Sequence, residues 1–209
     1  TPCGTLFPYT TLFRSTFMDA SFSHSLPGLI PVQSYSEQGM ILKENDYEWT
    51  GITPEKSYFG LDVWLDAEVS ENGTLSGVLS GEVSGYPSRI LRRDLALNRP
   101  ANEILKQLFF DSYPEAELQS AEITIHSDNR NVSVIRTDFE IQDYAVTYTE
   151  GMDYRPMVVG YLFRNPFERA ERRVPITLDA PETLSIDYRI TLPEGYRFDV
   201  SGETRSTSL

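Results

Sequence analysis

The sequence predicts an α+β fold: a mainly antiparallel β-sheet or sandwich with a pair of helices, incomplete at both ends. Three observations predict it. Strict alternation of apolar and polar side chains begins near residue 61 and returns near residue 184. Between these stretches, residues 89–109 place apolar side chains at helical spacing. Strands and helices do not alternate regularly as in a parallel βαβ fold, and this order favours an α+β domain.

Residues 16–53 show no clear periodicity. Proline and glycine interrupt them repeatedly, and Met40–Leu42 form one short apolar run. Because these residue types favour turns and loops, we expect a long connecting segment with little regular structure.

A hairpin is predicted over residues 61–84. One side of its first strand is apolar: Leu61, Val63, Leu65, Ala67 and Val69. Asn72-Gly73 supplies the positive φ angles of a tight turn, and a return strand follows over residues 74–84. Gly77 and Gly81 share the apolar side of that strand, which allows a close approach of another segment to the backbone there.

Two helices are expected next. Ile90, Leu91 and Leu95 recur at helical spacing in the first. Pro100 suits the first turn of the second helix, because its missing N–H would have no partner there. The second helix carries an apolar stripe and ends before Pro114; the stripe consists of Ile104, Leu105, Leu108 and Phe109.

The chain then returns to strands. Residues 122–126 and 132–141 are expected to pair across a polar turn, and residues 157–163 form a further apolar run. The clearest strand alternates Leu184, Ile186, Tyr188, Ile190 and Leu192 with polar residues. Pro193-Glu194-Gly195 predicts a turn at its end.

Charge and composition exclude several classes of function. The formal net charge is −13, and a strongly acidic chain without a basic stripe repels nucleic acid and anionic membrane surfaces. No apolar run approaches the ~18 residues of a membrane span, so we expect no membrane insertion. His24 and His126 are far apart in sequence, and Cys3 is the only cysteine. We therefore expect neither a cofactor nor a metal site.

The amino-terminal residues resemble a sequencing artefact more than a natural protein segment. Thr5 to Ser15 read Thr-Leu-Phe-Pro-Tyr-Thr-Thr-Leu-Phe-Arg-Ser, which resembles the translation of a sequencing-library adapter. The alternative is a short amphipathic strand. On the adapter reading, residues 1–15 are an artefact, the gene product begins near Thr16, and the chain is a fragment.

From about Phe17 onward the sequence resembles bacterial transglutaminase-like proteins, in which a β-rich domain, a transglutaminase-like core and a carboxy-terminal β domain follow one another. Three groups of motifs carry the resemblance. The end of the core is matched by Asp19-Ala20-Ser21 and Gly28-Leu29-Ile30-Pro31. The segment after the core is matched by Asp66-Ala67-Glu68, Asn72 to Gly77, Ser84-Gly85-Tyr86 and Leu91-Arg92-Arg93. The last domain is matched by Asn165-Pro166-Phe167, Arg172 to Ile176 and Leu192 to Tyr196.

This resemblance implies a division of the chain and a role for one residue. Residues 16–60 would end the core and its exit loop, 61–165 would form an α+β region, and 166–209 would begin a truncated carboxy-terminal β domain. The family's chemistry uses a Cys-His-Asp triad, and Asp19 matches the carboxylate that orients the histidine. The matching cysteine and histidine would precede Asp19, and Cys3 cannot serve. An ordinary turn aspartate is the alternative for Asp19.

The resemblance implies that the fragment is not itself an enzyme, although its parent would be an acyltransferase or amide hydrolase. We expect a supporting part of a periplasmic or secreted bacterial protein, with the missing core in the same chain as its partner. The rival hypothesis is an independent β module that binds glycan or peptide through a tyrosine-rich stretch, Tyr144, Tyr148, Tyr154 and Tyr161.

Other charged groups have simpler explanations. Asp138, Glu140 and Asp143 could act as paired carboxylates, but alternation places Asp138 and Glu140 on a solvated strand face. Two arginine groups could receive an acidic partner, although intramolecular ion pairs are favoured in an acidic chain. These groups are Arg89, Arg92 and Arg93, and Arg169, Arg172 and Arg173.

Overall fold

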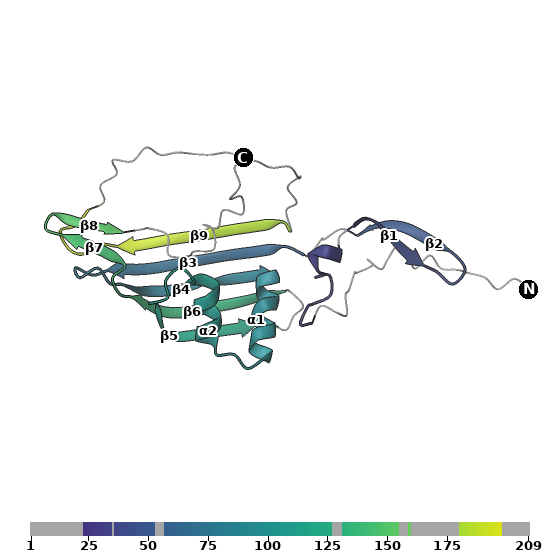
Figure 1. The fold of residues 1–209 in the computed structure, drawn as a ribbon, viewed down its shortest axis with the longest axis horizontal. Helices are drawn as coiled ribbons and strands as arrows, with labels where there is room; N and C mark the ends of the chain where they lie inside the picture. Colours follow the sequence, from purple (N-terminus) through teal and green to yellow (C-terminus); the bar gives the residue numbers. More distant parts are fainter. Residues whose placement is uncertain are drawn as a thin grey trace, which may run out of the picture.

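A five-stranded sheet forms the centre of the protein (Figure 1). The computed structural model describes residues 23–34, 36–52, 57–126, 131–154, 159 and 180–197. The strand order is β5-β6-β4-β3-β9, in which β3 and β9 run parallel and the other pairs run antiparallel. The strands are β3 (Phe59–Val69), β4 (Leu75–Gly85), β5 (Glu117–Ile125), β6 (Val132–Ile141) and β9 (Glu182–Thr191).

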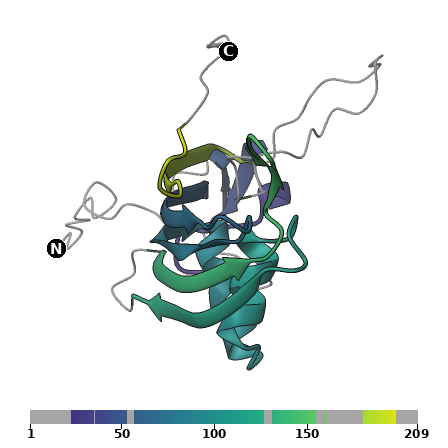
Figure 2. The same ribbon diagram turned by 90° about the vertical axis from the view of Figure 1, so that its left-hand side faces the viewer.

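Two helices, α1 (Tyr86–Ala96) and α2 (Ala101–Phe109), cover one face of this sheet, as the end-on view in Figure 2 shows. Two separate hairpins complete the described part. One consists of β1 (Ser36–Leu42) and β2 (Tyr47–Ile52), and the other of β7 (Ala145–Tyr148) and β8 (Gly151–Tyr154). The predicted α+β class and its mainly antiparallel sheet are therefore confirmed.

The core lies between the helices and the inner face of the sheet. Leu61, Val63 and Leu65 of β3 are at most 2% exposed, and the residues between them point outward. Leu65 is level with Leu79 on β4 and with Tyr188 on β9, so one row of inward side chains crosses the strands. Leu91 of α1 and Leu105 of α2 are fully buried against this face. The alternation in sequence thus sets which side chains leave water.

The turn between β3 and β4 depends on one glycine. Gly73 has a φ of 86° and donates its N–H to the Ser70 carbonyl at 2.9 Å. The predicted tight turn is present as a three-residue loop, but only Gly73, and not Asn72, adopts the left-handed conformation. The side chain of Asn72 accounts for the difference, because its Oδ1 accepts a hydrogen bond from the Thr74 N–H at 3.2 Å.

Gly77 lets β3 and β4 approach closely, as the sequence predicted. A Cβ atom at Gly77 would lie 2.3 Å from the Asp66 carbonyl oxygen and 2.6 Å from the Cβ of Ala67. The first of these contacts is with backbone, which cannot rotate away. The close approach expected at this glycine therefore comes from the neighbouring strand.

The hairpin β1–β2 corrects the expectation that residues 16–53 form an irregular connection. Its strands pair from Gly39 with Thr50 to Leu42 with Tyr47. The hairpin turn is closed by the Lys43 N–H, which donates to the Asp46 carbonyl at 2.8 Å. The sequence signal for these strands is weak, because only Tyr47 to Thr50 alternate and Met40 to Leu42 are apolar at every position.

The strand β9 falls within residues 166–209, the range assigned to a separate carboxy-terminal domain. It pairs with β3 from Glu182 opposite Phe59 to Thr191 opposite Glu68. Residues 182–191 thus belong to the same sheet as the strands of the 61–165 region, while the division of the chain itself stays a prediction. The turn expected after β9 is present, since the Tyr196 N–H donates to the Pro193 carbonyl at 3.1 Å.

We predict that Gly77→Ala lowers the free energy of unfolding by about 1–3 kcal/mol, because the new methyl group overpacks a backbone contact. Gly151→Ala is the matched control, since a Cβ atom there meets nothing within 4 Å. Urea unfolding of both variants would measure the difference. Equal stability of the two variants would contradict this account of Gly77.

Candidate functional site

Several residues named from the sequence lie outside the described part of the chain. Asp19, the candidate triad carboxylate, and Cys3 are among them, as is Tyr161 of the tyrosine-rich stretch. The second arginine group, Arg169, Arg172 and Arg173, also lies outside it. Their proposed roles stay predictions.

The two histidines occupy separate, exposed positions. His24 lies in a turn with a φ of 60°, and His126 follows the last residue of β5. Within the described ranges, no group of three or more His, Cys, Asp or Glu side chains could hold a metal ion.

The three carboxylates considered for acid–base chemistry do not share one element. Asp138 and Glu140 lie on the outer face of β6, between inward residues that are buried. Asp138 accepts a hydrogen bond from the hydroxyl of Ser120 on β5. Asp143 lies in the exposed turn before β7, with a φ of 52°. Their positions agree with the expected solvated strand face.

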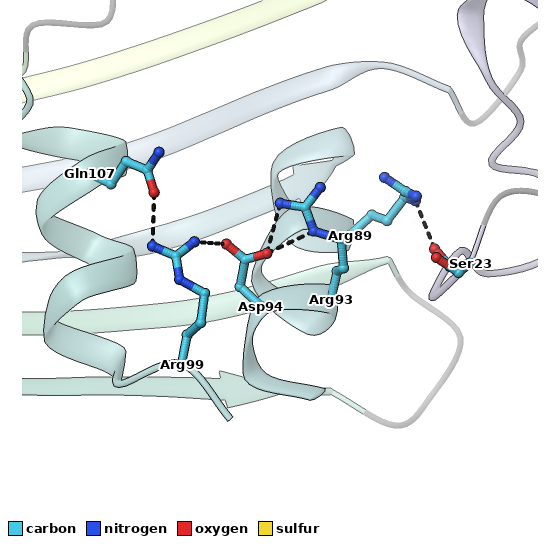
Figure 3. Close-up of polar contacts among 6 residues, drawn as sticks. All are labelled: Ser23, Arg89, Arg93, Asp94, Arg99 and Gln107. Atoms are coloured by element: carbon cyan, nitrogen blue, oxygen red, sulfur yellow. Dashed lines mark hydrogen bonds and ion pairs between the residues drawn. The ribbon is translucent and has the colours of Figure 1, made fainter. Parts of the chain in front are cut away.

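Arg93 of the first arginine group forms an intramolecular ion pair, as the sequence predicted. Figure 3 shows the carboxylate of Asp94, on α1, held between two guanidinium groups. Arg93 approaches it at 2.7 Å and Arg99 at 2.5 Å, and Asp94 is only 3% exposed. Arg99 also donates to Gln107 of α2 at 2.9 Å, so this cluster ties the two helices together.

The backbone beside this cluster ends α1 in a Schellman motif. Asn98 adopts a left-handed φ of 57°, and its N–H donates to the Leu95 carbonyl. The Arg99 N–H reaches back to the Asp94 carbonyl at 3.1 Å. Asparagine tolerates this conformation at a helix end, where glycine is commoner. The helix end and the ion pairs therefore fix the same short turn.

Arg89 and Arg92 of α1 bind neutral groups. The Arg89 Nε donates to the Ser23 carbonyl at 2.9 Å, and Arg92 donates to the side-chain oxygen of Asn131 at 3.0 Å. Burial lowers the pKa of both guanidinium groups, and the neighbouring Arg93 adds to the effect at Arg89. The sequence did not reveal these neutral partners, because they are distant along the chain.

The segment 23–34 is anchored beside the start of α1. Leu29 and Ile30 are buried, and the Ile30 N–H donates to the buried hydroxyl of Ser57 at 3.0 Å. The hydroxyl of Tyr86 donates to the Ile30 carbonyl at 2.6 Å. Because β1 follows directly after this segment, these contacts hold the base of the hairpin β1–β2.

One face of the hairpin β1–β2 is apolar and exposed; we call it the hairpin face and define it as Met40, Leu42, Tyr47 and Trp49. Met40 lies opposite Trp49, and Leu42 lies opposite Tyr47. Trp49 is 60% exposed and Leu42 is 76% exposed. The Tyr47 and Trp49 rings meet edge to face, with centroids 6.2 Å apart. Aromatic residues and methionine are enriched in protein–protein interfaces.

The tyrosines near β7 and β8 form a cluster at the other end of the sheet. Tyr144 is 8% exposed and lies between Tyr113 and Tyr154, with ring centroids 5.9 Å and 6.0 Å away. Burial raises the pKa of Tyr144, and the neighbouring phenols add to the effect. Tyr148, on β7, is 58% exposed. The sequence analysis included Tyr144 and Tyr154 in one tyrosine-rich stretch but missed Tyr113, which follows α2.

Burial acts on the pKa values of two more phenols. It raises the pKa of Tyr154, and it raises that of Tyr188 against an opposing hydrogen bond from the Val159 backbone. These side chains therefore favour the neutral phenol over the phenolate. Tyr144 is buried and Tyr113 and Tyr154 are half-buried, so the cluster is not one continuous exposed aromatic patch.

No protein-family model matches the sequence, and no curated protein or solved structure is significantly similar to it. Neither helix of the described part is both long and apolar enough to cross a membrane.

We predict that Asp94→Asn lowers the free energy of unfolding by about 2 kcal/mol, because two charge-assisted contacts to a buried group are lost. Asp66→Asn is the control. Asp66 is exposed and meets Arg189 at 3.4 Å, so its loss should change stability by less than about 0.5 kcal/mol. Urea unfolding would test both variants, and similar losses in the two would contradict the special role of Asp94.

We also predict that the protein loses stability above about pH 10, where tyrosines ionise in the unfolded chain. The folded protein holds the pKa of Tyr144 higher, so between the two values only the unfolded state releases the proton. Each such tyrosine then lowers the free energy of unfolding by up to about 1.4 kcal/mol per pH unit. Unfolding from pH 8 to 11 measures this, with Tyr144→Phe expected to flatten the slope and exposed Tyr148→Phe expected to keep it.

Proposed function

We propose that the chain is a supporting module of a bacterial transglutaminase-like protein and that it docks onto the catalytic core through the hairpin face. The motifs from Asp19 to Tyr196 that resemble this family support the choice of family. The exposure of Met40, Leu42, Tyr47 and Trp49 is the observation that carries the docking role. In this proposal the acyl transfer or amide hydrolysis belongs to the core, and this module positions it.

The geometry of the hairpin suits such a role. Two strands alone are marginally stable in water, so a hairpin with an exposed apolar face gains stability from a partner. Its base is held by Ser57 and Tyr86 through the segment 23–34. The tip carries Glu44 and Asp46, both exposed. The complementary surface on the core is therefore apolar with a basic rim.

The alternative is a β module that recognises a glycan or peptide. The cavity beside Tyr113, Tyr144 and Tyr154 favours it, since aromatic walls suit a small or extended ligand. Burial of Tyr144 argues for a mainly structural role of that ring. The supporting role is therefore preferred, because five of the ten large exposed apolar side chains in the described residues lie on β1 and β2.

The test is binding of a recombinant transglutaminase-like core, taken from a bacterial protein of the same three-part architecture, to this chain. Trp64→Phe leaves Trp49 as the only tryptophan, so a blue shift of its emission on titration reports burial of the hairpin face. Leu42→Ser combined with Trp49→Ser, followed by calorimetry, should weaken binding by roughly 30-fold.

Ile41→Ser is the matched control, because Ile41 is exposed on the opposite face of the same hairpin and should leave the affinity unchanged. A core that does not bind the unaltered chain would refute the supporting role. A core that binds the double variant as tightly as the unaltered chain would refute the hairpin face as the docking surface.

A further inference from the structure

The hairpin β7–β8 lies at the end of the sheet away from β1 and β2 (Figure 1). A cavity opens beside this hairpin. Its volume is about 370 Å³, which lies at the small end of the range for ligand sites. Three separate segments line it: Ser112 and Tyr113 after α2, Tyr144 and Val146 around the start of β7, and Asp153 and Tyr154 on β8. A site of this size holds a compact chemical group.

Three of the six lining residues are tyrosines. The rings of Tyr113 and Tyr144 are tilted by 46°, and those of Tyr144 and Tyr154 by 40°. Adjacent rings therefore present walls at different angles around one space. The face of an aromatic ring carries partial negative charge and attracts a cation placed over it. Several such walls around one cavity favour a cationic group over a neutral one.

The charge of the lining points the same way. Asp153 is exposed beside the cavity, and among the described residues that line it there is no lysine or arginine. The whole chain has a formal net charge of −13, so the field around it attracts cations. An anion would meet Asp153 and the ring faces unfavourably.

We propose that this cavity is an aromatic cage for a quaternary or alkylated ammonium group, with Tyr113, Tyr144 and Tyr154 as walls and Asp153 as counter-charge. A methylated ammonium has the compact, weakly hydrated form that suits such walls. A free choline-like compound and a trimethylated lysine side chain both present this group. This site is separate from the hairpin face and does not depend on the supporting role.

The test compares choline with 3,3-dimethylbutan-1-ol, an uncharged compound of the same shape, by calorimetry on the full chain. We expect choline to bind at least ~10-fold more tightly, because only the cation interacts with the ring faces. Equal affinities, or no binding of choline, would overturn the proposal. A trimethyllysine peptide in a third titration identifies the source: tighter binding than choline indicates a protein side chain, and weaker binding a free compound.

Two variants locate the site. Tyr154→Leu keeps much of the volume but removes one ring, and Asp153→Asn removes the charge; each should weaken choline binding about 5-fold or more. Tyr148→Leu and Glu150→Gln are the matched controls, because both residues are exposed on the same hairpin and neither lines the cavity. If Tyr154→Leu does not fold, the affinity of Asp153→Asn for choline still tests whether the cavity is the binding site. Unchanged binding in Asp153→Asn would overturn the assignment, and so would weakened binding in Glu150→Gln alone.

Discussion

The structure depends on removing one face of the central sheet from water. The strand β3 is eleven residues long and has neighbours on both sides, so its inward residues build the middle of the core. Val63 and Leu65 are almost fully buried, with Ile186 and Tyr188 level with them on β9. Each buried side chain of this size contributes about 1.5–3 kcal/mol. The helices α1 and α2 meet this requirement, because they form the layer that covers the apolar face of the sheet.

The two hairpins lie at the ends of the sheet, where side chains need not be buried in the core. The hairpin β7–β8 is tied to the sheet, since the Ala145 N–H donates to the Gly73 carbonyl at 2.9 Å. The hairpin β1–β2 is connected through the segment 23–34 and keeps its apolar residues exposed. The candidate functional surfaces are found at these two ends, where side chains are positioned by the core without being part of it.

The sequence predicted the elements whose two faces differ in environment. Alternation revealed β3, β4, β6 and β9, and helical spacing revealed α1 and α2, because burial had selected apolar residues at those periods. The same logic explains the failure at β1 and β2. In β1 the residues Met40 to Leu42 are apolar at every position, and in β2 the alternation runs only from Tyr47 to Thr50, so neither strand is clearly marked in the sequence. The register that places Met40 opposite Trp49 is a property of the folded chain alone.

The residues that line the candidate cavity were only partly predictable, because the sequence does not show which tyrosines are buried or which distant residue joins them. Tyr144, Tyr148 and Tyr154 are equivalent by composition, yet Tyr148 faces solvent while Tyr144 is buried. Tyr113 joins them because α2 ends against β5 and the chain then turns toward β7. The only local signal was the apolar stripe of α2, which continues into Phe109 and Phe110 and carries Tyr113 to this end of the sheet.

Facing acidic residues on the outer face of the sheet explain why the proposed docking surface lies at one end of the sheet and not over its middle. Asp62 lies directly opposite Glu82, and Glu117 directly opposite Glu140. Like charges in facing positions repel each other, and water screens them as long as the face stays hydrated. Covering this face with a neutral partner would remove that screening and raise the repulsion. An apolar partner therefore meets less resistance at the hairpin face than it would over the middle of the sheet.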